Sequence, residues 1–161
     1  MAFSKEEKLL NSSLEGSKVF YFIENIDYMD IFSVELTQDS DIKDLYLRLV
    51  NSKSRTIELL MSLRNKIMTI LVAKSVIKEI NDDFAIGNTI GLFKIYFIDE
   101  KEIVSGLKDN HLDFCISFYK IDNKVILSTL VKYNNTFGKV YMNIIKPFHK
   151  LVVKSILKNL K

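Results

Sequence analysis

The feature that most constrains the fold is a long apolar stripe near the carboxyl end of the chain. Between residues 137 and 160 apolar side chains recur every three or four positions, at Val140, Tyr141, Ile144, Ile145, Phe148, Leu151, Val152, Ile156 and Leu160. This spacing predicts an amphipathic helix about 36 Å long, with Asn135 or Thr136 as its N-cap. Pro147 lies inside the pattern, so either the helix is kinked there or two helices abut.

The preceding chain predicts a sheet that this helix can cover. Alternation with a period of two residues predicts strands over residues 28–36, 93–97, 102–107, 112–119 and 125–134. In the first strand, Phe32, Val34 and Leu36 are the predicted core-facing side chains. Asp122, Asn123 and Lys124 form a predicted turn between the last two strands. Strands joined by such short turns must pair antiparallel.

Two shorter helices are predicted between the first strand and the later ones. Ser40 is the expected N-cap of the first helix, in which Ile42, Leu45, Tyr46 and Leu49 share one face. The second begins near Ser54 or Thr56. Because helices and strands are segregated along the chain, the fold class is α+β. The length of 161 residues fits a single domain, with residues 1–18 as a candidate N-terminal extension.

Composition limits the partners and the location of the protein. The net charge of +3 is spread along the chain, which does not predict a nucleic-acid-binding face. Lys146, Lys150, Lys154 and Lys158 are expected to face solvent, on the side of the last helix opposite its apolar stripe. Cys115 is the only cysteine, so no intrachain disulfide is expected and a buried, inert thiol is predicted. No signal peptide or integral membrane segment is predicted, and we expect a reducing, cytoplasmic location.

Three groups of residues carry a resemblance to a known family. They are Leu63-Arg64-Asn65, then Asp109-x-His111-Leu112-Asp113-Phe114, then Asn135-x-x-Gly138-x-x-Tyr141 followed by Pro147-Phe148-His149. This pattern resembles a bacterial family of unknown function in the START-like or SRPBCC superfamily, over about residues 27–157. Lys139 stands where arginine is usual in that family. The resemblance implies one domain of the helix-grip fold over residues 1–161, in which a curved antiparallel sheet wraps a long C-terminal helix.

The two histidines are the candidate catalytic residues, together with Asp113. His111 and His149 each lie in one of the motifs and can act as acid and base, with Asp109 and Asp113 as carboxylate partners. On a regular strand Asp109, His111 and Asp113 would share one side. The structural alternative is that His111 and Asp113 pin a strand entrance and that His149 docks the kinked helix. Their spacing matches no recognised metal signature, so neither a metal nor a cofactor is predicted.

The candidate ligand-binding residues are polar or amphipathic groups near the predicted pocket, namely Arg64, Asp109, Tyr133, Asn134 and Tyr141. Arg64 lies in an apolar helix segment and needs an acidic partner, which is either Asp109 or Asp113 of the chain or an acidic group of a ligand. Tyr133, Asn134 and Tyr141 either pack in the core or line the mouth of a pocket.

Three functions remain open at this point. The first is the binding of a hydrophobic or amphipathic small molecule between the sheet and the C-terminal helix, which rests on the analogy of fold. The alternative is an enzyme of the cyclase, dehydratase or hydrolase type that uses the polar residues at the pocket. The third is an interaction protein without a ligand. In each case the protein is expected to be a monomer or a homodimer.

Overall fold

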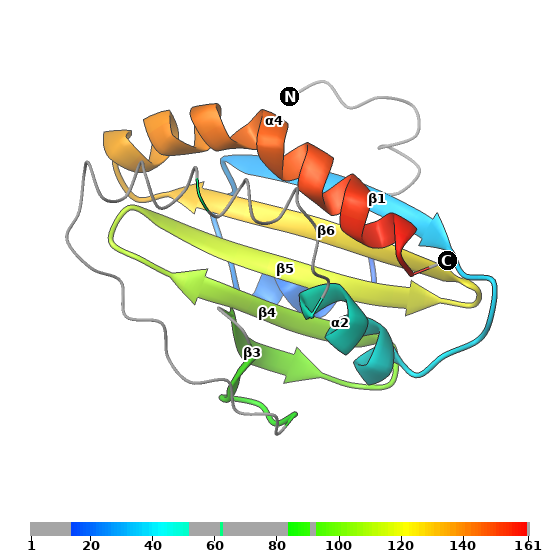
Figure 1. Cartoon of the computed structure of the whole chain (residues 1–161). Coiled ribbons are helices and arrows are strands. Elements are labelled where there is room, and N and C mark those ends of the chain that lie inside the picture. Colours follow the sequence, from blue (N-terminus) through cyan, green and yellow to red (C-terminus); the bar gives the residue numbers. More distant parts are fainter. Residues whose placement is uncertain (1–13, 52–61, 63–83, 91–92, 161) are drawn as a thin grey trace.

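The computed structural model describes residues 14–51, 62, 84–90 and 93–160. The helical elements are the 3-10 helix η1 (Lys18–Tyr21) and the α-helices α2 (Ile42–Val50) and α4 (Thr136–Lys158). The strands are β1 (Tyr28–Glu35), β2 (Thr89–Ile90), β3 (Phe93–Ile98), β4 (Glu102–Lys108), β5 (Leu112–Ile121) and β6 (Lys124–Tyr133). Figure 1 shows α2 and α4 on one side of the sheet and η1 on the other side. We call these the inner and the outer face of the sheet.

Within the described residues the strands form one antiparallel sheet in the order β1-β6-β5-β4-β3-β2. The first strand therefore pairs with the last one, and α4 follows directly from β6. The turn between β5 and β6 is Asp122–Asn123, where Asp122 has a φ of 49°. This left-handed conformation suits a tight hairpin turn, and Asp tolerates it better than most residues. The predicted α+β class, the antiparallel sheet and the C-terminal helix are confirmed.

α4 is one continuous helix that runs through Pro147. The Asn135 side chain accepts a hydrogen bond from the Gly138 amide at 3.0 Å and caps the first turn, so Asn135 and not Thr136 is the N-cap. Proline lacks the amide that would bond to the Asn143 carbonyl. Figure 1 shows α4 changing direction between its orange and red halves, while the helix contacts both β1 and β6.

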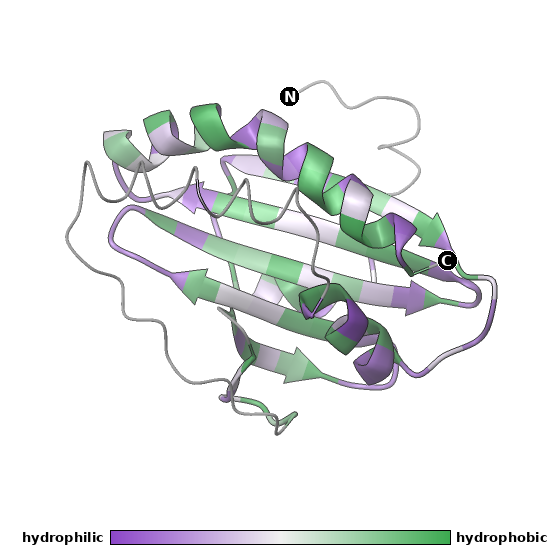
Figure 2. Ribbon diagram, in the orientation of Figure 1, coloured by the Kyte–Doolittle hydropathy of each residue, from purple (hydrophilic) through white to green (hydrophobic). Residues whose placement is uncertain are grey.

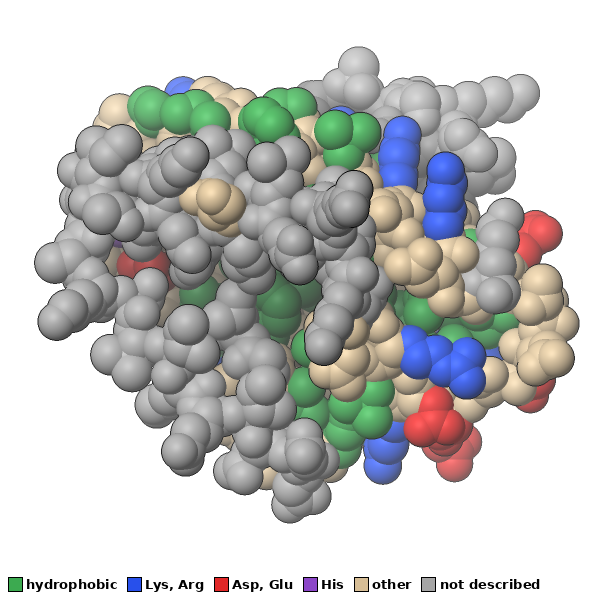
Figure 3. Space-filling model, viewed as in Figure 1, with side chains coloured by type: hydrophobic (Ala, Val, Ile, Leu, Met, Phe, Trp, Pro, Cys, Tyr) green, Lys and Arg blue, Asp and Glu red, His purple; other side chains and the backbone are tan. Residues whose placement is uncertain are grey.

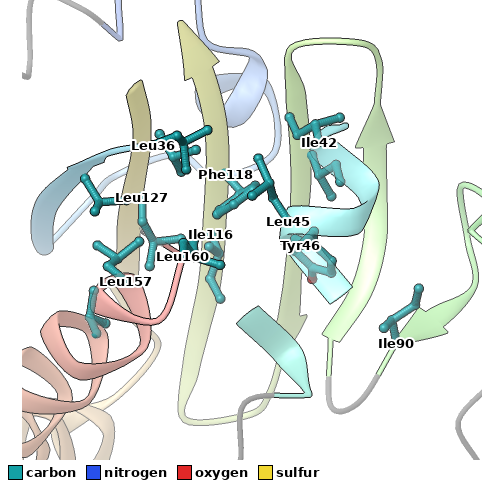
Figure 4. Packing of buried hydrophobic residues seen from close by; sticks show 14 of the residues in the cluster. Leu36, Ile42, Leu45, Tyr46, Ile90, Ile116, Phe118, Leu127, Leu157 and Leu160 are labelled. Atoms are coloured by element: carbon teal, nitrogen blue, oxygen red, sulfur yellow. The ribbon is translucent and has the colours of Figure 1, made fainter. Parts of the chain in front are cut away.

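The larger hydrophobic core lies on the inner face, where the sheet meets α2 and the end of α4. Figure 4 shows Leu45 and Tyr46 of α2 directed at Phe118 on β5, with Leu157 and Leu160 lying near Leu127. The Tyr46 hydroxyl donates a hydrogen bond to the Ser105 hydroxyl at 2.8 Å, so its polar end is satisfied inside this core. Figure 2 shows runs of hydrophobic residues separated by polar ones along the central strands, which fits a sheet with buried side chains on both faces.

The outer face of the sheet is also buried, because residues 14–23 lie across it. Leu14 packs with Ile31 and Ile126, and Val19 packs with Cys115 in a neighbouring cluster. The prediction that the first strand has only one core-facing side is therefore wrong. Ile31, on the opposite side from Phe32 and Val34, is 3% exposed.

A buried carboxylate holds the N-terminal segment on this face. Glu102 of β4 is 2% exposed and accepts hydrogen bonds from the Ser17 and Ser117 hydroxyls, each at 2.5 Å. It also accepts a hydrogen bond from the Lys18 amide at 2.7 Å. Three donors compensate the desolvation of the carboxylate, so the segment is attached at a defined point rather than by apolar contact alone.

The first helix after β1 agrees with the prediction except at its cap, and the second cannot be compared. α2 buries Ile42, Leu45 and Tyr46, as predicted. Its N-cap is Asp41 and not Ser40, because the Asp41 side chain accepts a hydrogen bond from the Lys43 amide at 2.7 Å. The helix predicted to begin near Ser54 or Thr56 lies outside the described residues.

Burial along α4 differs from the predicted stripe. The buried side is formed by Gly138, Met142, Ile145, Val152, Val153 and Leu157. Three predicted members of the stripe are exposed instead: Val140, Ile144 and Leu151. The reason is that apolar residues cover more of the helix surface than a sheet can contact on one side. Of the lysines expected opposite the sheet, Lys146 and Lys154 lie at the helix–sheet boundary, with their ammonium groups over aromatic rings of β1.

Candidate functional site

A cluster of polar side chains interrupts the apolar inner face beneath α4. Asp30 on β1 and Thr129 on β6 are neighbours in the sheet register. The Tyr28 hydroxyl donates a hydrogen bond to Asp30 Oδ2 at 2.6 Å. His149 of α4 places its Nε2 atom 3.2 Å from Thr129 Oγ1 and 3.6 Å from Asp30 Oδ2. Phe114 of β5 meets the His149 ring edge-on, with centroids 6.3 Å apart. We call Tyr28, Asp30, Thr129 and His149 the inner polar cluster.

Among the residues that the structure describes, two buried polar atoms on the inner face have no hydrogen-bond partner. They are Asp30 Oδ1 and Tyr133 Oη. Tyr133 lies four residues beyond Thr129 on β6, so its side chain is on the same face of the sheet. The Lys146 ammonium group lies 4.7 Å from the centroid of the Tyr28 ring and 5.8 Å from that of Tyr133, so one cation covers both rings. Because buried polar atoms are nearly always paired, these two atoms are candidates for contact with a ligand.

His111 lies elsewhere, in the loop between β4 and β5 that meets the start of α4. Its carbonyl oxygen accepts a hydrogen bond from the Asn134 amide at 2.9 Å. The Asn135 side-chain amide donates to the Asn110 carbonyl at 3.0 Å, and the same nitrogen lies 3.0 Å from His111 Nδ1. The His111 ring also packs edge-on against Phe137, with centroids 4.6 Å apart. These contacts join the loop to the first turn of α4.

The two aspartates of the same motif belong to this junction as well. The Asn134 side-chain amide donates to the Asp109 carbonyl at 2.8 Å and to Asp113 Oδ1 at 2.9 Å. β5 begins only at Leu112, so Asp109 and His111 are in the loop and do not share one side of a strand with Asp113. Asp113 alternates with Leu112 and so lies on the outer-face side of β5, away from the inner polar cluster.

The two histidines are therefore far apart. The backbone of His111 touches α4 at Gly138, and His149 lies eleven residues further along the helix, which corresponds to about 16 Å. Of the three candidate catalytic residues, only His149 is in the inner polar cluster. Tyr141 stacks on Phe137 near the start of α4, with centroids 6.4 Å apart. Arg64 lies outside the described residues.

Possible metal ligands, the cysteine and the helices are the other features that bear on function in the described part of the chain. Across the described ranges, no group of three or more His, Cys, Asp or Glu side chains is arranged to hold a metal ion. Burial raises the pKa of the Cys115 thiol to about 12, so this group is an inert packing residue at neutral pH. None of the helices in the described part of the chain is both long enough and apolar enough to cross a membrane.

Sequence reasoning missed three members of the inner polar cluster: Tyr28, Asp30 and Thr129. A signal for Asp30 was present, because it has the same strand parity as Phe32 and Val34, which were predicted to face the core. An acidic residue at such a position needs a buried partner. The sequence could not identify that partner, because β1 and α4 are more than 100 residues apart in the chain.

The fold and the inner polar cluster define a class of protein: an α+β domain of the helix-grip type, with a long C-terminal helix over buried polar groups of the sheet. The chain belongs to the family described as "Protein of unknown function (DUF2867)", whose model matches residues 22–156. The resemblance to a family of unknown function, inferred from the motifs, is thereby confirmed.

Two solved structures are similar to this chain at low identity. One is the solution NMR structure of the Polyketide_cyc-like protein Cgl2372 from Corynebacterium glutamicum, with 11% identity, a TM-score of 0.37, and coverage of 82% of this chain and 86% of that one. The other is the crystal structure of the Mll3558 protein from Rhizobium loti, with 10% identity, a TM-score of 0.35, and coverage of 83% and 96%. No match was found among the curated proteins.

Proposed function

We propose that this domain binds an amphipathic small molecule between the inner face of the sheet and α4. The observation that supports the proposal is the pair of unpartnered buried atoms, Asp30 Oδ1 and Tyr133 Oη, beneath one helix. Leaving a buried polar group unpaired costs about 1–3 kcal/mol, and more for a charged group. A ligand that supplies the missing hydrogen bonds would recover that free energy on binding.

The chemistry of Asp30 Oδ1 defines the polar end of the ligand. Asp30 Oδ2 already accepts a hydrogen bond from Tyr28, so Oδ1 is the oxygen left to accept one from an N–H or O–H group. The surrounding inner face is apolar, with Phe114 and Leu127 close to the cluster in the register of the sheet. We therefore infer a ligand with an amine or hydroxyl end and an apolar body. A carboxylate end would be repelled by Asp30.

The proposal can be tested with a defined mixture of a long-chain amine, the matching alcohol and the matching fatty acid. Native mass spectrometry should show that the amine or the alcohol is retained in preference to the acid. Asp30→Asn should weaken that retention at least tenfold, because it removes the charge and changes one acceptor oxygen into a donor. The matched control is Glu35→Gln, on the exposed end of the same strand. Equal retention of all three probes, or of none, would contradict the proposal.

A second candidate function is an enzyme that uses His149 as a general acid or base. The observation in favour is the distance of 3.6 Å between His149 Nε2 and the buried carboxylate of Asp30, which can hold the ring in one orientation. In a screen of esters, hydratable enones and linear polyketide mimics, His149→Gln and Asp30→Asn should both abolish any turnover. Activity that survives in both variants would exclude this role.

A further inference from the structure

α4 carries a second apolar surface, which faces away from the sheet. Val140, Ile144, Pro147 and Leu151 follow one another at intervals of four, three and four residues, so they form one row along the helix. Pro147 is exposed, and Val140, Ile144 and Leu151 are 53%, 45% and 60% exposed. We call these four residues the outer row of α4. In Figure 3 green side chains follow the upper edge of the molecule, where α4 lies in the same view.

Lysines accompany the outer row, and no acidic residue does. At about 3.6 residues per turn, the exposed residues Lys139 and Lys150 fall on one side of the row. Lys158 continues the row itself at the end of the helix. No Asp or Glu occurs between Thr136 and Lys158, so every lysine on the exposed side of α4 lacks an acidic neighbour on the same helix. An exposed apolar row flanked by lysines on a helix is the pattern of a surface that binds an anionic interface.

We propose that the outer row of α4 docks this domain on an anionic lipid membrane surface. The apolar side chains would enter the boundary between headgroups and acyl chains, and the lysines would contact the lipid phosphates and carboxylates. This inference is independent of the ligand proposed above. It concerns a helix lying in the plane of the interface, with no segment crossing the bilayer.

Charge and size favour a membrane over a second protein. Two copies that packed α4 against α4 would bring Lys139, Lys150 and Lys158 of both copies together without an acidic partner on α4, which opposes association. The outer row is also a narrow, convex surface of four side chains. A stable protein interface buries about 800 Å² on each partner, far more than four partly exposed side chains provide. A lipid surface needs less apolar area, because electrostatic attraction adds to it.

Vesicle sedimentation tests the proposal directly. The full chain should bind vesicles made of equal parts of phosphatidylcholine and phosphatidylserine at low ionic strength, and should not bind vesicles of phosphatidylcholine alone. Ile144→Gln combined with Leu151→Gln should weaken binding at least tenfold, because two apolar side chains are lost from the interface. Ile86→Gln is the matched control, since Ile86 is 62% exposed but does not belong to α4. It should bind as the wild type does.

Charge is tested separately. Lys150→Gln should weaken binding about fivefold, and added salt should weaken the binding of the wild type. Lys43→Gln, on the exposed side of α2, should have no effect. All variants should keep the wild-type thermal midpoint, since every altered side chain is exposed.

Absence of binding to the anionic vesicles, or equal binding by the α4 variants and their controls, would overturn the proposal. So would a dimer in analytical ultracentrifugation that Ile144→Gln with Leu151→Gln dissociates, because the partner would then be a second copy.

Discussion

The substitution Gly138→Ala should destabilise this protein, although the same change stabilises most helices. Gly138 lies in the first turn of α4, and its backbone is pressed against the loop between β4 and β5. A Cβ atom at this position would lie 2.0 Å from the His111 carbonyl oxygen and 2.9 Å from the carbonyl carbon. Both atoms belong to the backbone, so no side-chain rotation can relieve the contact.

The sign of the effect follows from comparing two magnitudes. In an open helix, alanine is favoured over glycine by about 0.8–1.0 kcal/mol. Here the loop must move away from the helix, and overpacking of this kind costs about 1–3 kcal/mol. The movement also disturbs the hydrogen bonds from the Asn134 amide to the His111 carbonyl and from the Asn135 side chain to the Asn110 carbonyl. Each contributes about 1 kcal/mol. We therefore expect a net loss of about 2 kcal/mol.

Urea denaturation followed by circular dichroism measures this loss. A decrease of about 2 kcal/mol in the free energy of unfolding corresponds to a thermal midpoint lower by about 4–8 °C in a chain of this size. Thr136→Ala is the control, because Thr136 is exposed and lies in the same turn of α4. Its stability should change by less than about 0.5 kcal/mol. If Gly138→Ala were as stable as the wild type, the contact between the loop and α4 would not exist in solution.

Three further predictions concern single groups. Tyr46→Phe leaves the Ser105 hydroxyl buried without its 2.8 Å hydrogen bond, and urea denaturation should show a loss of about 1–2 kcal/mol. The Cys115 thiol, with its pKa raised to about 12, should react with an aromatic disulfide at pH 8 roughly a hundredfold or more slowly than in urea, whereas equal rates would show that it is accessible in the fold. A hydrogen bond from Lys120 lowers the pKa of exposed Asp39, so its stabilising effect is present above the ordinary Asp value of about 3.9 and is lost as the pH falls. Lys120→Met should remove this part of the pH dependence of the thermal midpoint, and an unchanged pH profile would show that the pair contributes nothing.

The junction between the β4–β5 loop and α4 shows what motif reading can and cannot provide. The sequence singled out His111, Asp113 and Asn135 as members of unusual motifs, and all three have specific contacts in the structure. Those contacts join a loop to a helix cap. A motif identifies residues that need specific neighbours. Whether such a residue has a structural or a catalytic role depends on which side chain or backbone group contacts it. That group is supplied by a segment some 25 residues away.

The inner polar cluster was predicted only in part for a related reason. His149 and Tyr133 are candidates from the sequence, whereas Asp30 is not. Strand parity alone places Asp30 with Phe32 and Val34. The contacts of Asp30 with Thr129 and His149 depend on the pairing of β1 with β6 and on the position of α4 above both strands.

By itself the sequence determined five of the six described strands, the C-terminal helix and the antiparallel pairing of strands joined by short turns, because periodicity and turn signals act over a few residues. Only the tertiary structure decided which apolar residues of α4 are buried, since a sheet covers one side of a helix and leaves the outer row exposed. It also decided that residues 14–23 cover the second face of the sheet and that Asp30 meets His149. These contacts join segments far apart in the chain, and burial there depends on the packing of the whole domain.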